Sequence, residues 1–210
     1  GSSPALAPEL GIIYIGLEFG LLGKQGGIAA IDIKTGTRLW RHTTTRHTHC
    51  SPLYIPEENM VVIGSNDSMI YAYHAKTGEL LWNTHCVGNA KSSFAYYAKR
   101  RLILFGTVGG NTFYALSAAT GAIEQSKELR ADMYSTPLVV GDVVYLTALD
   151  KYVYALNLDT FKSVWELQTM GRIFSSPVLA DNSLWVGSND GQLYELNPDK
   201  IGRASCRERV

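Results

Sequence analysis

Two short stretches carry the residue types that most often bind transition metals. The sequence reads HTHC at residues 47–50 and NTHC at residues 83–86. Zinc prefers histidine nitrogen and cysteine thiolate, and the two stretches together could supply the four ligands of a tetrahedral site. Their spacing matches no zinc motif, however. The strands predicted below also place one stretch before an inner strand and the other after an outer strand, so we predict no metal site.

Three aspartates occupy one repeated position, and carboxylates can also bind cations. Asp67, Asp150 and Asp190 each lie in a short polar turn between two apolar runs. An aspartate in such a turn bonds to its own backbone and stabilises the turn. Because the three residues belong to separate structural units, we expect them to form turns and not one ion site.

The composition limits the classes of partner. The chain has 210 residues, of which 46% are hydrophobic and 18% charged, and its net charge is zero. These values suit a folded domain with a real core. With a net charge of zero, the chain has no excess of positive charge to attract nucleic acid. The apolar runs are far shorter than the roughly 20 residues of a membrane-spanning helix, so we predict no membrane span.

An internal repeat must position any site that the chain carries. Apolar, β-rich runs end at Gly16, Gly64, Gly106 and Gly187, and Thr147 takes the same place between the last two. The successive steps are 48, 42, 41 and 40 residues. Each repeat alternates in hydrophobicity and contains turn residues at fixed places, which is typical of four short antiparallel strands. We therefore predict an all-β fold, a β-propeller fragment of about four to five four-stranded blades.

One tryptophan and one glycine recur in the outer part of the repeat. Trp40, Trp82 and Trp165 share a column, and each of the turn glycines Gly36, Gly78 and Gly121 precedes the tryptophan position by four residues. We expect each glycine to adopt positive φ and each indole to pack between blades, with its N–H bonded to a backbone carbonyl.

Two repeats depart from this pattern. Gln125 takes the tryptophan position of the third repeat, so we expect the seam after the third blade to be the weakest. Phe161 takes the glycine position of the fourth repeat, and we expect that turn to change type because a bulky residue is strained at positive φ.

The line AIDIKTGTRLW at residues 30–40 resembles the PQQ-type β-propeller repeat, with the form A-x-D-x-x-T-G-x-x-x-W. The resemblance covers residues 11–200. That family includes quinone-dependent alcohol dehydrogenases, outer-membrane-protein assembly lipoproteins and accessory domains of adenylating enzymes and kinases. Its rings usually have seven or eight blades, which implies that this chain is a fragment and that the rest of the parent propeller is one of its partners.

The repeat phase gives the expected domain limits. We place the repeats at residues 11–45, 46–87, 88–130, 131–170 and 171–200, with the first lacking its innermost strand and the fifth its outermost. Residues 1–10 form an upstream remnant. Residues 201–210, IGRASCRERV, differ abruptly in composition and resemble a translated sequencing adapter, so we expect a non-native tail.

Chemically variable residues gather where each repeat enters its innermost strand, at the expected mouth of the central channel. A scaffold that repeats its strands and varies its loops presents these residues to a ligand; they are His47, His49, Asn89, Lys91, Asp132, Tyr134 and Arg172. An insertion in the first repeat adds Phe19, Leu21 and Leu22 on the same side, either packed on the first blade or exposed as a partner contact.

The sequence favours a non-catalytic scaffold that binds a protein or peptide at the channel mouth, without a cofactor. A fragment of a quinoprotein alcohol dehydrogenase is the first alternative and would bring PQQ and calcium. The resemblance then implies an adjacent cysteine pair, which this sequence lacks. An accessory or sensor propeller of an adenylating enzyme or kinase is the second. The location stays open between the periplasm, where the protein could be a membrane-anchored lipoprotein, and the cytoplasm.

Overall fold

Short antiparallel strands build the whole described molecule. The computed structural model describes residues 2–20, 25–198 and 205–207, and within these residues twenty strands form five four-stranded sheets. The first three sheets contain β1 (Ala5–Ala7), β2 (Ile12–Phe19), β3 (Gln25–Asp32) and β4 (Arg38–Thr44); β5 (Leu53–Ile55), β6 (Met60–Gly64), β7 (Met69–His74) and β8 (Leu80–His85); and β9 (Ala95–Tyr97), β10 (Leu102–Gly106), β11 (Thr112–Ser117) and β12 (Ile123–Glu128).

The last two sheets follow the same plan. They contain β13 (Leu138–Val140), β14 (Val143–Thr147), β15 (Tyr152–Asn157) and β16 (Ser163–Gln168); and β17 (Val178–Ala180), β18 (Ser183–Gly187), β19 (Leu193–Leu196) and β20 (Ser205–Arg207). Short 3-10 turns, η2 (Pro56–Glu58) and η3 (Ala98–Arg100), link the first two strands of the second and third sheets. This is the all-β, blade-by-blade architecture that the repeat predicts.

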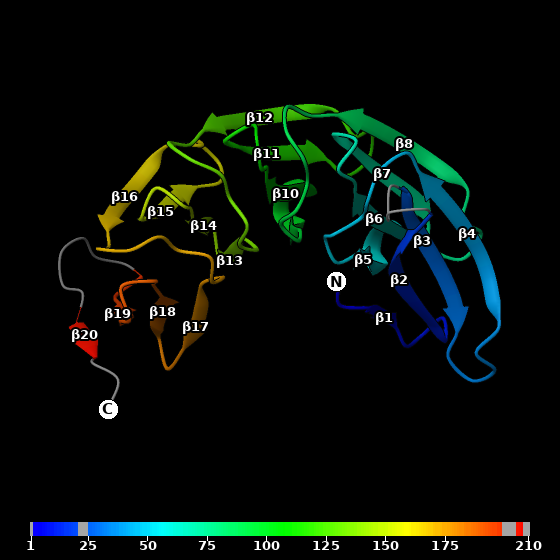
Figure 1. Ribbon diagram of the computed structural model, residues 1–210, viewed down its shortest axis with the longest axis horizontal. Helices are drawn as coiled ribbons and strands as arrows, with labels where there is room; N and C mark the ends of the chain where they lie inside the picture. The colour runs from blue at the N-terminus through cyan, green and yellow to red at the C-terminus, as the bar shows by residue number, and fades with distance from the viewer. Residues whose placement is uncertain (1, 21–24, 199–204, 208–210) are drawn as a thin grey trace.

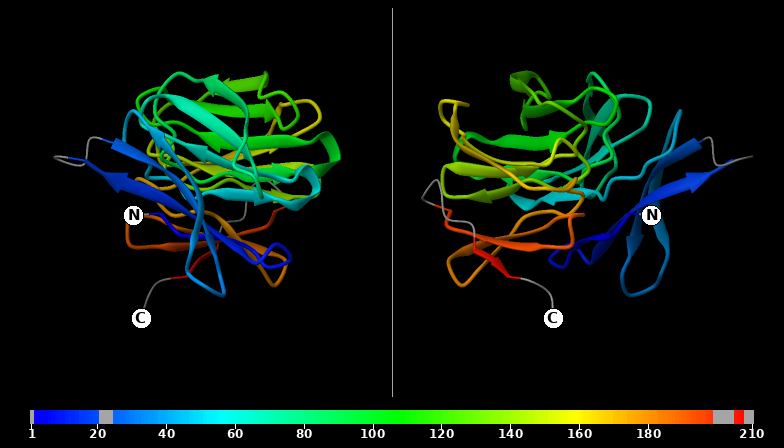
Figure 2. Two further views of the ribbon diagram at one scale, coloured as in Figure 1. Left: turned by 90° about the vertical axis from the view of Figure 1, so that its right-hand side faces the viewer. Right: turned by 60° about the vertical axis from the view of Figure 1, so that its left-hand side comes forward.

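The five sheets follow one another along an open arc (Figure 1). The short first strands β1, β5, β9, β13 and β17 line the concave side, and the fourth strands lie on the convex side. Figure 2 shows the arc from two further directions, with the β2–β3 hairpin projecting from the first sheet. Turns between the first two strands therefore lie on one face of the arc, and the segments that enter the next sheet lie on the other.

Two strands that we expected to be missing are present: the innermost strand of the first sheet and the outermost strand of the fifth. β1 pairs with β2, with Ala5 opposite Tyr14, so the first sheet has its innermost strand. The signal was present in the sequence, since residues 2–7 read SSPALA and residues 175–180 read SSPVLA. In the fifth sheet, β20 pairs with β19 through the backbone and supplies the fourth strand. Because backbone pairing is indifferent to side-chain type, the origin of residues 201–210 stays a prediction.

The core lies between successive sheets, because the central strands of the inner sheets are covered on both faces. All five residues of β10 are buried, and so are those of β6. By contrast, most of β12, on the convex side, is exposed. A central strand covered on both faces reads as a continuous apolar run and does not alternate. Three clusters of buried side chains fill the seams between sheets.

The tryptophan column joins each sheet to the next. The indole N–H donates to a carbonyl of the following repeat in three seams: Trp40 to Ala75 at 3.2 Å, Trp82 to Ala118 at 2.8 Å and Trp165 to Pro198 at 3.1 Å. In the first two of these seams, the turn glycine of the next sheet lies under the ring. A Cβ on Gly78 would lie 2.7 Å from the Trp40 ring, and one on Gly121 would lie 2.5 Å from the Trp82 ring. These glycines are required for the seam as well as for the turn.

The third seam exchanges the two partners. Gln125 replaces tryptophan in the third sheet, and Phe161 replaces glycine in the fourth. Phe161 stacks on Phe113 of the third sheet, with centroids 5.7 Å apart and planes 12° from parallel. An aromatic ring thus fills this seam from the opposite side, which offsets the weakness expected at Gln125.

The turn at Phe161 does not change type, contrary to our expectation. Phe161 keeps φ at +58°, and its N–H donates to the Asn157 carbonyl at 2.7 Å, as the N–H of Gly78 does to the His74 carbonyl at 2.9 Å. A side chain in the left-handed region costs roughly 1–2 kcal/mol. Burial of the ring offsets that cost.

Two turn glycines allow a matched test of the seam. Gly36 and Gly78 have φ of +70° and +75°, but nothing lies within 4 Å of a Cβ on Gly36. We expect Gly36→Ala to lower the free energy of unfolding by about 1 kcal/mol, from backbone strain alone. Gly78→Ala should cost about 1–3 kcal/mol more, because its methyl group enters the Trp40 ring. Urea denaturation measures both, and equal losses would contradict the role of the glycine in the seam.

The exchanged seam predicts coupling between its two positions. Gln125→Trp alone should destabilise the fold, because the Phe161 side chain already occupies the space above the turn. Phe161→Gly alone should remove the ring that stacks on Phe113 and leave a void in the seam. The double variant recreates the tryptophan–glycine pair, so we expect a coupling free energy of at least about 1 kcal/mol in its favour. A double-mutant cycle in urea measures it, and additive effects would argue against the exchange.

Candidate functional site

The seven expected mouth residues fall into two sets on the segments that enter β5, β9, β13 and β17. His49, Lys91 and Tyr134 stand at one repeated position, which Phe174 takes in the fifth sheet. We call these four side chains the mouth row. His47, Asn89, Asp132 and Arg172 stand two residues earlier and form the outer set. Buried residues separate the two sets, namely Thr48, Ala90, Met133 and Ile173.

Side chains of the mouth row contact one another from sheet to sheet. The Lys91 Nζ lies 5.9 Å from the centre of the Tyr134 ring, within the range of a cation–π contact. The Tyr134 and Phe174 rings are tilted by 47° with centroids 5.6 Å apart. Tyr134 is 37% exposed and Phe174 46% exposed. The structure therefore brings together residues of three successive sheets into one exposed surface.

His49 begins the row and is held by the first sheet. Its Nδ1 lies 2.8 Å from Glu18 Oε1, at the end of β2, and its ring stacks on His47 with centroids 5.3 Å apart. Burial lowers the pKa of His49, and the nearby His47 and Lys91 lower it further, against the opposing effect of Glu18. Because the Glu18 carboxylate can only accept, His49 Nδ1 carries the hydrogen of this 2.8 Å contact.

Most of the outer set supports the loops. Asn89 pairs with Val108 through both backbone groups, at 2.8 and 2.9 Å. The Asp132 Oδ1 accepts a 2.6 Å hydrogen bond from the Gly109 N–H, while the His47 carbonyl accepts one from Asn66 at 2.8 Å. Arg172 differs from the others, because its side chain is exposed. Of the outer set, Arg172 is thus the residue best placed to meet a partner.

Sequence reasoning missed the residues that fix the row in place. The residue after each row position has a small, polar side chain bonded to the backbone of the adjacent strand. Ser92 Oγ donates to the Gly106 carbonyl at 2.8 Å and accepts from the Gly106 N–H at 3.0 Å. Cys50 and Ser175 make the same pair of contacts with Gly64 and Gly187. The Cys or Ser that recurs two residues before a proline or phenylalanine was the available signal.

The next residue along links neighbouring sheets. The Ser3 N–H donates to Ser51 Oγ at 2.9 Å, and the Ser51 N–H donates to Ser93 Oγ at 3.3 Å. The Thr136 N–H donates to Ser176 Oγ at 2.8 Å. These bonds tie neighbouring innermost segments together just beneath the row in the first, second and fourth seams.

The turn aspartates hold their own turns, and two of them also bond to the preceding repeat: Asp67 Oδ2 accepts from the Thr45 hydroxyl at 3.0 Å, and Asp190 Oδ2 accepts from the Met170 N–H at 2.9 Å. Oδ1 of Asp67, Asp150 and Asp190 accepts the N–H two residues on, at 2.9–3.0 Å, and Oδ2 accepts a tyrosine hydroxyl four residues on. In the third repeat Gly109 takes this position. Asp132 bonds to its N–H from the following segment. The carboxylates thus serve the turns, and Asp132 substitutes for the missing one.

The described residues do not fit the metal or quinone chemistry of the alternatives. In the described ranges, no three His, Cys, Asp or Glu side chains gather as a cation site. Cys50 and Cys86 are both free and buried, and burial raises the pKa of each thiol to about 12. A protonated thiol is a poor metal ligand, and these two cysteines form no adjacent pair. We therefore derive no step through PQQ or calcium.

The insertion in the first repeat is only partly described. Phe19, at the end of β2, is half-buried, and the Arg41 guanidinium lies 4.2 Å from the centre of its ring. Leu21 and Leu22 lie outside the described residues. At Phe19, the hairpin therefore packs on its own sheet.

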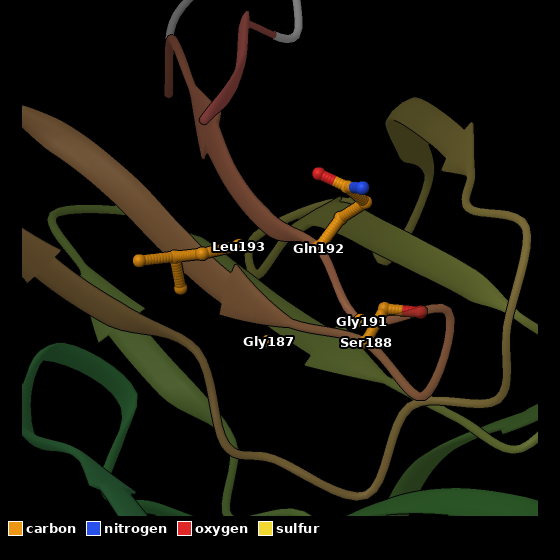
Figure 3. A pocket seen from close by; sticks show the side chains of 5 residues that line it. All are labelled: Gly187, Ser188, Gly191, Gln192 and Leu193. Atoms are coloured by element: carbon orange, nitrogen blue, oxygen red, sulfur yellow. The ribbon is translucent and has the colours of Figure 1, made fainter. Parts of the chain in front are cut away.

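A hollow of about 250 Å³ lies at the turn between β18 and β19 (Figure 3). It is lined by Gly187, Ser188, Gly191, Gln192 and Leu193. Gly187 is the counterpart of Gly64 and Gly106, against which Ala90 and Met133 of the next repeat pack. The hollow thus corresponds to a packing position between sheets and not to part of the mouth row.

Comparisons with known proteins agree with this architecture. Residues 24–104 and 92–203 match the protein family described as outer membrane protein assembly factor BamB. BamB of Legionella pneumophila is 23% identical, over 93% of this chain and 50% of that protein. Tetrathionate hydrolase of Acidithiobacillus ferrooxidans is 29% identical, over 67% of this chain and 25% of that protein. The crystal structure of BamB from Moraxella catarrhalis has a TM-score of 0.80 at 16% identity, covering 97% of this chain and 62% of that one.

These matches cover only part of the length of each relative. The chain spans about half the length of the Legionella protein and a quarter of the hydrolase. The structural likeness, at 16% identity, shows the fold. In the described part of the chain, no helix is both long and apolar enough to cross a membrane.

The two kinds of outer-set residue should differ in their effect on stability. Asp132→Ala removes the acceptor of the Gly109 N–H, and we expect a loss of about 1 kcal/mol in the free energy of unfolding. Arg172→Ala should change it by less than about 0.5 kcal/mol, because its side chain is exposed. Urea denaturation of both variants is the measurement. An unchanged Asp132→Ala variant would remove the structural role given to this carboxylate.

Proposed function

The chain belongs to the outer membrane protein assembly factor BamB family, and on this basis we propose that it is a non-catalytic β-propeller scaffold that binds a protein or peptide at the mouth row. The observation that carries the proposal is the chain of contacts from Lys91 through Tyr134 to Phe174. The three side chains come from one column of a regular repeat, yet they differ in chemistry while the strands around them do not. Loop side chains that vary on a constant framework of strands are typical of a binding surface.

The chemistry of the row favours a partner that carries both carboxylates and apolar side chains. Tyr134 and Phe174 expose ring surface that a partner would remove from water. Lys91 and Arg172 are the cations of this region, and within the described residues neither forms an ion pair. Aromatic residues and arginine are enriched in the central part of protein interfaces. An extended segment with alternating acidic and aromatic residues would satisfy both features.

The family supports a location and a wider assembly. The description of the family names the assembly of outer membrane proteins, so we place the protein in the periplasm, next to the outer membrane. The further sheets of a parent propeller are one partner in this proposal, and an acidic, aromatic polypeptide is the other. Neither partner is nucleic acid, because the chain has no net positive charge.

A peptide-binding experiment tests the mouth row. We expect a short fluorescent peptide of alternating glutamate and phenylalanine to bind, and a lysine–phenylalanine peptide to bind more weakly because it repels Lys91 and Arg172. The variant Lys91→Ala/Tyr134→Ala/Arg172→Ala should weaken binding of the acidic peptide at least tenfold, measured by fluorescence anisotropy. Binding should also weaken as salt rises, because exposed charge pairs are screened.

The opposite face of the arc provides the control. Lys76 and Lys162 are exposed in turns on that face, and Lys76→Ala/Lys162→Ala removes the same charge as the two cations of the row. This variant should bind the acidic peptide within twofold of the unchanged protein. If the triple variant also binds as tightly as the unchanged protein, the mouth row is not the binding surface.

A further inference from the structure

We propose that the seam between the fourth and fifth sheets holds a binding site for the ring of a small para-substituted phenol. The site lies on the face opposite the mouth row, so it does not rest on the proposed function. It is a hollow of about 260 Å³. A cavity of roughly 150 Å³ is enough to hold benzene. The lining residues are Val140, Val143, Tyr145, Leu179, Asn182 and Pro198.

The first seam of the protein has the same frame. Tyr14 lies 5.8 Å from Trp40, and both donate to the Ala75 carbonyl, at 3.0 and 3.2 Å. In the fourth seam, Tyr145 lies 5.8 Å from Trp165, and both donate to the Pro198 carbonyl at 3.1 Å. The protein therefore contains two copies of one arrangement, and the first copy shows what the second can accommodate.

The two seams differ at the middle residue of the short first strand. In β5 this residue is Tyr54, whose ring lies 5.7 Å from Tyr14 at a tilt of 32°. In β17 the residue is Leu179, which has no ring and is 37% exposed. The hollow lies beside Leu179 and Tyr145, which is where the frame of the first seam holds the Tyr54 ring. The ring that Tyr54 contributes to the first seam therefore has no counterpart at Leu179 of β17.

The second seam supports the same chemistry. Tyr96 stands at this position of β9, and its hydroxyl donates to Glu58 Oε1 at 2.7 Å. The Tyr54 hydroxyl likewise donates to Glu9 Oε1 at 2.5 Å. The Tyr54 and Tyr96 rings thus pack in the seam while the hydroxyl group of each donates to one carboxylate. The repeat therefore favours a phenol over a plain hydrocarbon ring.

The hollow between the fourth and fifth sheets has both an apolar wall and a polar group. Val140 and Val143 provide apolar wall, and Tyr145 provides an aromatic surface against which a second ring prefers a tilted or offset position. Asn182 supplies the polar group, since its amide can donate to or accept from a phenol hydroxyl. Asp181 and Asn182 both have positive φ, at 50° and 60°, as in a tight β-hairpin turn. This turn fixes the backbone at the polar end.

Titration with p-cresol tests the site in the whole chain. We expect saturable shifts of the Leu179, Val140 and Val143 methyl signals in NMR, one p-cresol per chain, with a Kd on the order of 1 mM for so small a ligand. Toluene should bind at least threefold more weakly, because it lacks the hydroxyl. Asn182→Ala should reduce that preference without abolishing the binding of toluene.

Two matched variants exchange the seams. Leu179→Tyr supplies the missing ring from the chain itself and should weaken p-cresol binding at least tenfold, while the thermal midpoint stays equal or rises. Tyr54→Leu opens the corresponding place beside Tyr14 and should add a second, equivalent p-cresol site. Leu179→Phe provides the same test as Leu179→Tyr if the tyrosine variant does not fold.

The proposal is overturned by any of three results. The first is the absence of saturable shifts when the unchanged protein is titrated with p-cresol. The second is a folded Leu179→Tyr or Leu179→Phe variant that binds p-cresol as tightly as the unchanged protein does. The third is a set of shifts that maps to a different part of the chain. Loss of acidic-peptide binding at the mouth row leaves this site unaffected, so the two proposals fail separately.

Discussion

The packing of one sheet against the next is the interaction on which the whole molecule depends. A single four-stranded sheet of this sequence has two apolar faces, and neither can be covered within one repeat. The indole of one sheet therefore lies over the turn glycine of the next and donates to a nearby carbonyl, as Trp82 does with Gly121 and Ala118. This contact sets both the distance and the angle between sheets, and it recurs with the period of the sequence.

The same constraint explains how the protein tolerates variation. Where Gln125 removes the indole, Phe161 brings a ring from the other side and accepts a strained backbone in exchange. Where Leu179 takes the place of the tyrosine found in the first two seams, a hollow remains beside Tyr145. The first change preserves the packing and the second leaves it incomplete. A seam can therefore be filled from either sheet, provided that the total volume is maintained.

Polar groups divide between those that the scaffold uses and those that remain available. The small polar residue after each row position bonds to the next strand, the turn aspartates hold their turns, and Asp132 supports the turn at Gly109. Lys91, Tyr134, Phe174 and Arg172 remain exposed or partly exposed at the mouth. Function at this surface needs no change in the scaffold, which is consistent with one fold serving relatives as different as an assembly factor and a hydrolase.

The sequence by itself determined the repeat, the four-stranded plan of the three middle sheets and the column of tryptophans, because alternation and turn glycines are local properties of the chain. It also indicated which segments carry variable residues. Only the tertiary structure decided that Asp132 is used by a turn, that Phe161 replaces a missing indole and that Tyr134 meets Lys91 and Phe174. The last two are contacts between residues about forty positions apart, in adjacent sheets. The curvature of the arc sets such contacts, and no single repeat contains that information.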